Sequence, residues 1–143
     1  IYCDFCALSP SQRQQLLRIF HDHLKPDGMM FLDVFSLNAF HSKQEVTIFE
    51  HQLLDGFWSP NDYFGFLKTV KYDQEKVILD KYTIIEKSRQ NSIYNWLQYY
   101  DRASLEKELD DSGFQIEAWY SNAAGEPFQK DSETIAVAAK KTR

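Results

Sequence analysis

The alternation of apolar and polar residues predicts a helix between two strands in the first 36 residues. Residues 1–5 form a short apolar run that reaches an acid, which is typical of a strand. Apolar residues then recur at helical spacing between positions 16 and 24, and Pro26 ends that pattern. Residues 29–34 are apolar except for Asp33, which favours a strand buried on both faces of a parallel sheet. Together these segments predict one parallel crossover unit.

The start of the helix carries several agreeing signals. Ser9 can cap it, Pro10 suits its first position, and Gln12 stands where a capping box needs Glu or Gln. Asp27-Gly28 supplies the turn into the following strand. The helix is therefore predicted to begin at about Pro10.

From residue 46 the pattern becomes that of an antiparallel sheet. A polar loop is expected over residues 36–44, and extended segments follow at 46–54, 64–72, 77–87 and 93–100, separated by polar turns. Short strands joined by such turns predict a β-meander.

The last third of the chain returns to an α/β pattern. Asp101 can cap a helix that carries Leu105 and Leu109 and ends at Gly113. Strands are predicted at 114–120 and 134–140, with a polar loop between them. The fold class is therefore α/β, with residues 1–45 and 101–143 as one part and residues 46–100 as an antiparallel insert.

Composition narrows the function classes. The length of 143 residues suits one domain, and the net charge of −5 without a basic face argues against nucleic acid as a partner. No apolar run approaches the roughly 20 residues that span a bilayer. A cytoplasmic protein with no membrane partner is expected.

Cys3 and Cys6 have the C-x-x-C spacing of some redox and zinc sites. A thioredoxin-like pair needs a turn that leads into a helix, and a zinc site needs two more ligands; the nearest candidates, His21 and His23, do not share a helix face. The favoured interpretation is a pair of buried, reduced thiols, with no metal site.

Two sets of motifs together resemble a known family. Asp4-Phe5, the segment Leu24-Lys25-Pro26-Asp27-Gly28 and Leu32-Asp33-Val34 resemble the second half of class I S-adenosylmethionine-dependent methyltransferases, whose turn reads "LKPGG". Residues 104–114 are similar to the family's helix and sixth strand, and residues 134–140 to its antiparallel seventh strand. The resemblance implies the C-terminal part of a Rossmann-like methyltransferase sheet with an antiparallel β-meander insert.

The resemblance also implies a cofactor, S-adenosylmethionine, and places Asp4, Phe5 and Cys6 beside its methionine part. The family's glycine-rich loop is absent, because the five glycines of the chain are too far apart to form one. That loop is expected to precede Ile1. The chain is therefore expected to be a C-terminal fragment that is inactive alone and binds the cofactor weakly or not at all.

The acceptor is expected to be a small molecule, bound by aromatic residues of the insert. In related methyltransferases such an insert often covers the acceptor site, which suggests substrate contacts from Trp58, Phe57, Tyr63 and Tyr94. These aromatic residues could equally form a lid, the insert's own core or a homodimer interface. His41 and His51 are candidate general bases because histidine titrates near neutral pH; no other catalytic residue is identified.

Two alternatives remain open at this point. The first is a non-catalytic binding or dimerisation module built on the aromatic β-meander. The second is another α/β enzyme, such as a nucleotide-binding hydrolase, that shares the crossover unit by chance.

Overall fold

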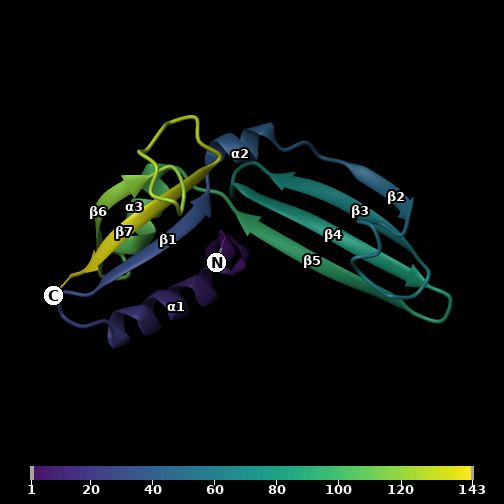
Figure 1. Cartoon of the computed structure of the whole chain (residues 1–143), viewed down its shortest axis with the longest axis horizontal. Helices are drawn as coiled ribbons and strands as arrows, with labels where there is room; N and C mark the ends of the chain where they lie inside the picture. The colour runs from purple at the N-terminus through teal and green to yellow at the C-terminus, as the bar shows by residue number, and fades with distance from the viewer. Residues whose placement is uncertain (1, 143) are drawn as a thin grey trace.

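The computed structural model describes residues 2–142 as a three-stranded sheet covered by helices and a separate four-stranded sheet (Figure 1). No helix among these residues is long and apolar enough to cross a membrane. The elements follow in the order η1 (Asp4–Ala7, a 3-10 helix), α1 (Pro10–His23), β1 (Met29–Phe35), α2 (Leu37–Ser42), β2 (Thr47–His51), β3 (Tyr63–Tyr72), β4 (Val77–Glu86), β5 (Gln90–Gln98), α3 (Arg102–Asp110), β6 (Phe114–Tyr120) and β7 (Thr134–Lys141).

The three-stranded sheet has the order β1-β7-β6, and β7 runs antiparallel to both neighbours. As the middle strand, β7 is buried along most of its length. Helices α1 and α3 cover the same face, where Leu17, Leu105 and Leu109 are fully buried against Val137. The predicted strand at 114–120 and the antiparallel direction of the last strand are confirmed.

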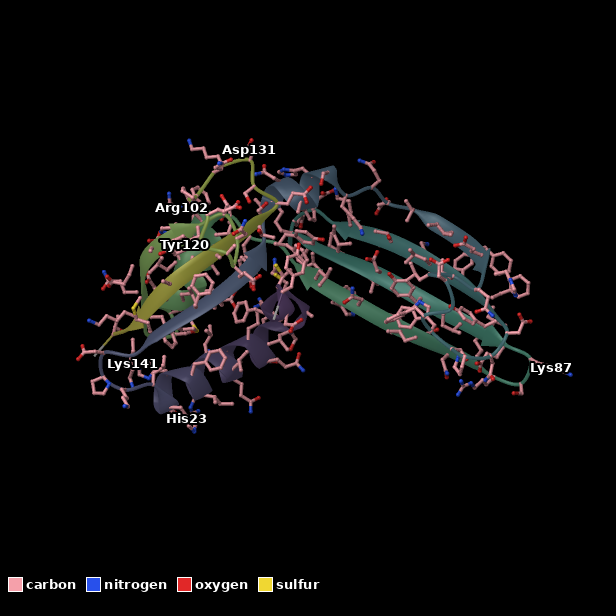
Figure 2. The ribbon with its side chains drawn as sticks, in the orientation of Figure 1. His23, Lys87, Arg102, Tyr120, Asp131 and Lys141 are labelled. Carbon is pink, nitrogen blue, oxygen red and sulfur yellow. The ribbon has the colours of Figure 1, made fainter. Side chains whose placement is uncertain are left out.

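Both longer helices begin as the sequence predicts. The Ser9 side chain accepts a hydrogen bond from the Gln12 backbone N–H, and the Gln12 side-chain oxygen accepts one from the Ser9 backbone N–H, which completes the capping box. Asp101 caps α3 through the Ser104 backbone N–H at 2.8 Å. At the other end of α1, the Lys141 ammonium donates to the His21 carbonyl at 2.6 Å, where a cation is favoured by the helix dipole. His23 and Lys141 lie close to this end in Figure 2.

The predicted strand over residues 1–5 is wrong. Ile1 lies outside the described residues, Tyr2 and Cys3 form a turn, and η1 follows. Cys3 has a φ of 53°, in the left-handed region, which is incompatible with a strand. Its N–H is bound by the Asp33 side chain at 3.1 Å and not by a neighbouring strand. The predicted parallel crossover unit is therefore not formed within residues 2–142.

The expectation that β1 is buried on both faces is also wrong. Met30 and Val34 face the helices and are buried, whereas Met29 and Phe31 are 55% and 50% exposed on the opposite face. In the described residues β1 pairs only with β7, so the sheet ends at β1.

The four-stranded sheet, β2-β3-β4-β5, is the predicted antiparallel meander. Two details differ: β5 begins at Gln90, inside the predicted turn, and β2 ends at His51, within the strand predicted over residues 46–54. The segment 36–44 contains α2, capped by Ser36. One face of this sheet is covered at its near end by Phe40 of α2 and at its far end by the segment between β2 and β3. The mixed α/β fold class is as predicted.

Candidate functional site

A cleft of about 680 Å³ lies between the N-terminal segment and the near end of the four-stranded sheet. Figure 1 shows η1 and the start of α1 beside the end of the sheet where β5 finishes. We call it the junction cleft. Its lining combines residues 6–10, Gln12 and Arg13 with Tyr72, Glu75, Val77, Trp96 and Gln98 of the sheet.

The N-terminal wall of the junction cleft is fixed by β1. Asp33 accepts from the Cys3 N–H, and the Phe35 N–H donates to the Cys6 sulfur at 3.3 Å. Both cysteines are free and 1% exposed. A hydrogen bond to Cys6, together with burial and the charge of Asp33, raises the pKa of the Cys3 thiol, so it stays protonated. The pair holds a turn in place.

Arg13 forms the floor between the two helices. Its Nε donates to Glu108 Oε1 at 2.6 Å and its Nη1 to the Leu8 carbonyl at 2.7 Å, although the residue is only 5% exposed. The guanidinium also lies 5.8 Å from the ring centres of Phe5 and Tyr100. Tyr100 donates to the second Glu108 oxygen at 2.9 Å, and burial, with Glu108, raises its pKa. This network joins α1, α3 and the residue after β5.

The sheet wall of the junction cleft is aromatic and carries one carboxylate. The rings of Tyr72 and Trp96 lie 5.6 Å apart on neighbouring ends of β3 and β5. Glu75 lies in the turn between β3 and β4. Its backbone carbonyl accepts a hydrogen bond from the Gln98 side chain at 2.8 Å. An aromatic wall beside an exposed acid suits an organic ligand with a polar or cationic group.

The structure places the sequence-predicted cofactor residues on two sides of η1. Cys6 lines the junction cleft, whereas Asp4 and Phe5 line a second groove of about 370 Å³ with Phe31 and Asp33. Asp4 is exposed, and Phe5 is buried apart from its edge. The three residues are close in sequence but face different hollows.

The four predicted substrate residues are not brought together. Phe57 and Trp58 lie in the segment between β2 and β3, at the far end of the sheet, where Trp58 packs on Tyr82 with ring centres 4.7 Å apart. Tyr63 is 1% exposed and donates to the Leu53 carbonyl, so it belongs to the core beneath that segment. Tyr94 is on the opposite face of the sheet, beside Lys81.

The two candidate bases lie outside the junction cleft. His41 is exposed on α2. His51 pairs with Asp62 at 2.5 Å beside Phe64, and Tyr72 lies eight residues further along β3 than Phe64, a distance of about 26 Å. A general-base role for His51 at the junction cleft would therefore need a large rearrangement.

Sequence reasoning missed Arg13, Glu75 and Val77 as lining residues. The Arg13–Glu108 pair joins positions 95 residues apart, and nothing local indicates it. The alternation along β3 could have placed Tyr72 on one face, but its partner Trp96 follows only from the strand register. Among residues 2–142, no group of three or more His, Cys, Asp or Glu side chains could hold a metal ion.

Neither a protein-family model nor a curated protein matches the sequence. Solved structures do match the fold. The chain is 13% identical to the CcbJ methyltransferase from Streptomyces caelestis, with a TM-score of 0.64 over 97% of this chain and 53% of that one. An S-adenosylmethionine-dependent methyltransferase from Clostridium acetobutylicum is 12% identical to the chain, with a TM-score of 0.67 over 100% of this chain and 58% of that one.

The sugar N-methyltransferase KedS8 from Streptoalloteichus also matches, at 11% identity and a TM-score of 0.56, over 100% of this chain and 54% of that one. At these identities the likeness shows the fold: a mixed α/β arrangement found in methyltransferases. The chain spans a little over half the length of the structures that it resembles.

Proposed function

We propose that these residues form the acceptor-side part of an S-adenosylmethionine-dependent methyltransferase with a small-molecule acceptor. The observation that carries the proposal is the junction cleft, where Cys6 of η1 faces Tyr72 and Trp96 of the insert. The methyltransferase fold of the similar structures supports the reaction type. In this reading the insert at residues 46–100 supplies the acceptor side, and residues 1–45 and 101–143 supply part of the cofactor side.

The residues around η1 fit the positively charged part of such a cofactor. S-adenosylmethionine carries an ammonium and a sulfonium, and when bound it supplies the methyl group. The groove that Asp4 lines offers a carboxylate beside the ring of Phe31, a combination that favours cations. In the proposal, Asp4 binds the ammonium group and Phe5 shapes the wall beside it, while Cys6 lines the junction cleft on the other side of η1.

The chain's own part in the reaction is mainly to position the acceptor. Methyl transfer is an in-line displacement, so an acceptor held against Tyr72 and Trp96 gains most from fixed orientation. Glu75 is the carboxylate of the junction cleft that could take the acceptor's proton. We assign the role of general base to Glu75 in place of His41 and His51, because neither histidine lines the junction cleft.

The proposal concerns the whole protein's activity. A glycine-rich loop, which lets backbone N–H groups approach the cofactor, cannot be formed by five widely spaced glycines. The 143 residues alone are therefore expected to give no measurable heat when titrated with S-adenosylmethionine, even when circular dichroism shows them folded. Tight binding in that titration would show that the cofactor site is wrongly placed.

The test of the function is binding and methyl transfer by the whole protein. Calorimetry should detect S-adenosylmethionine binding, and Asp4→Asn should weaken it about tenfold through loss of a charged hydrogen bond. Asp131→Asn, at an exposed loop position visible in Figure 2, is the matched control and should bind normally. The second measurement is transfer of a labelled methyl group from S-adenosylmethionine to a panel of small amines, phenols and carboxylic acids. A folded whole protein that neither binds the cofactor nor transfers the methyl group would reject the proposal.

A further inference from the structure

One face of the four-stranded sheet is aromatic and open. Strand register places alternate residues of β2 to β5 on this face, opposite to the side that α2 covers. We call it the aromatic face. Its large exposed side chains are Phe49, Phe64, Phe66, Tyr72, Ile85, Tyr94 and Trp96.

The aromatic face is continuous with the junction cleft. Tyr72 and Trp96 belong to both, at the near end of the sheet. Phe66 lies further out, its ring tilted against that of Phe49 with centres 6.4 Å apart, and the rings of Phe49 and Phe64 stack at 5.3 Å. A molecule that enters the junction cleft can therefore extend along the sheet, past the row of Lys68 and Lys81, to these outer rings.

The strands contribute lysines and no acid to the aromatic face, whose two ends carry Glu75 and the His51–Asp62 pair. The residues that share it on β2 to β5 include Lys68 and Lys81 but no Asp or Glu. Lys68 and Lys81 are direct cross-strand partners, in one row with Tyr94. Like charges placed directly opposite each other destabilise a sheet, so folding alone does not account for this pair.

No carboxylate among residues 2–142 forms an ion pair with Lys68 or Lys81. This stands out in a chain with a net charge of −5. The Lys81 ammonium lies 5.4 Å from the centre of the Tyr94 ring. Lys68 is exposed and Lys81 half-buried, so both ammonium groups can reach a ligand on this face.

We infer that the aromatic face binds the body of an anionic acceptor: an aromatic or apolar small molecule with a carboxylate, sulfate or phosphate group held by Lys68 and Lys81. The inference rests on the proposed function and names its substrate class. Tyr72 lies four positions after Lys68, which is about 13 Å along β3. The anionic group therefore lies about that far from the part of the acceptor in the junction cleft.

The same charges disfavour a second copy of the chain as the occupant. Two aromatic faces packed on each other would bury two lysine pairs in one interface, and β2 to β5 place no acid on this face to pair with them. An anionic ligand, in contrast, gains two charge-assisted contacts and relieves the repulsion between the lysines.

The experiment uses two fluorescent probes of similar aromatic size on the purified protein: anionic anilinonaphthalene sulfonate and uncharged phenylnaphthylamine. The test variant is Lys68→Gln with Lys81→Gln. Sulfonate binding should weaken about fivefold in the double variant, from the loss of two surface charge contacts, while binding of the neutral probe stays within about twofold. Lys87→Gln, at the far tip of the sheet in Figure 2, should leave both probes unchanged.

The double variant should remain folded, because removing opposed like charges does not destabilise a sheet. A melting temperature at or above that of the parent protein would show that the double variant is folded. Equal changes for both probes, or no change for either, would overturn the inference. A dimer by sedimentation that Phe66→Glu converts to monomer would assign the face to a second copy and also overturn it. Neither probe needs cofactor or methyl transfer, so failure here is distinct from failure of the proposed function.

Discussion

The Arg13 guanidinium donates to the Glu108 carboxylate across 2.6 Å, and this pair joins the first helix to the last. Its side chains are 7% and 24% exposed. Because Arg13 also holds the Leu8 carbonyl and Glu108 also accepts from Tyr100, the pair fixes one wall of the junction cleft. The Arg13 guanidinium, the Glu108 carboxylate and the Tyr100 hydroxyl are joined by hydrogen bonds, and removing any one of them takes a partner from another.

Arg13→Met should therefore destabilise the protein by about 3 kcal/mol, since it removes the cationic partner of a partly buried carboxylate and the side-chain donor to the Leu8 carbonyl. The free energy of unfolding in urea measures the effect. Lys107→Met is the matched control, because the Lys107–Asp111 pair on α3 is exposed and its loss should change little. Equal effects from the two variants would show that the Arg13 network contributes no more than a surface pair.

A second ionic site anchors the segment between β2 and β3. Glu86 accepts from Ser59, Asn61 and Arg89, and these hydrogen bonds, from Arg89 first, lower its pKa from 4.5 to about 2. A carboxyl whose pKa is lower in the folded state stabilises the fold above its unfolded pKa. That stabilisation is lost as the pH falls from about 4.5 to about 2.

Glu86→Gln should thus lower the melting temperature at pH 7, and the gap to the parent protein should close as the pH approaches 2. Melting curves at several pH values measure this gap. Glu106→Gln, an exposed position on α3, should show no such convergence. A gap that stays constant down to pH 2 would mean that the carboxylate's charge is not what holds the segment.

The sequence predicts the elements whose signals are local. The Ser9 capping box, the Asp101 cap and the alternation along β3 and β4 each depend on neighbours within a few residues, and each is confirmed. The predicted strand at 1–5 fails because an apolar run does not reveal the left-handed backbone of Cys3 or its bond to Asp33, 30 residues away.

The site depends on contacts that are distant in sequence. Tyr72 and Trp96 meet only because two hairpins set the register of three strands, and a shift of one residue would turn either ring to the other face. Trp58 is equally aromatic and lies in a loop, so composition alone favours it. The difference between the two tryptophans is one of tertiary position.

Close packing at Gly65 supports the covered face of the sheet. A Cβ at this position would lie 2.4 Å from Leu53 Cβ, far inside contact distance. Leu53 is 2% exposed and belongs to the cluster beneath Trp58. Gly65→Ala should therefore destabilise the protein by about 1–3 kcal/mol, although alanine is otherwise better than glycine in a strand.

The double variant Gly65→Ala with Leu53→Gly, which removes the Leu53 Cβ, tests the cause of that loss. If the clash with Leu53 is responsible, the combined destabilisation measured in urea should be smaller than the sum of the two single effects. Simple additivity would show that the backbone at Gly65, and not the neighbouring side chain, excludes alanine.

Substitution of the two tryptophans, Trp96 and Trp58, distinguishes between the two candidate acceptor sites. Trp96 is 44% exposed where the junction cleft meets the aromatic face, so Trp96→Ala in the whole protein should raise the acceptor KM about tenfold by removing a stacking surface. Cofactor affinity, measured by calorimetry, should stay the same. Trp58→Ala, at the far end of the sheet, is expected mainly to lower stability, because its ring packs on Tyr82.

The two variants carry the same chemical change, so each is the control for the other. The sequence alone favours Trp58 as the acceptor contact, and a larger KM effect from Trp58→Ala than from Trp96→Ala would restore that hypothesis. In that case the acceptor would bind under the segment between β2 and β3, on the face opposite to Lys68 and Lys81. A larger effect from Trp96→Ala would place it at the junction cleft, within reach of Glu75.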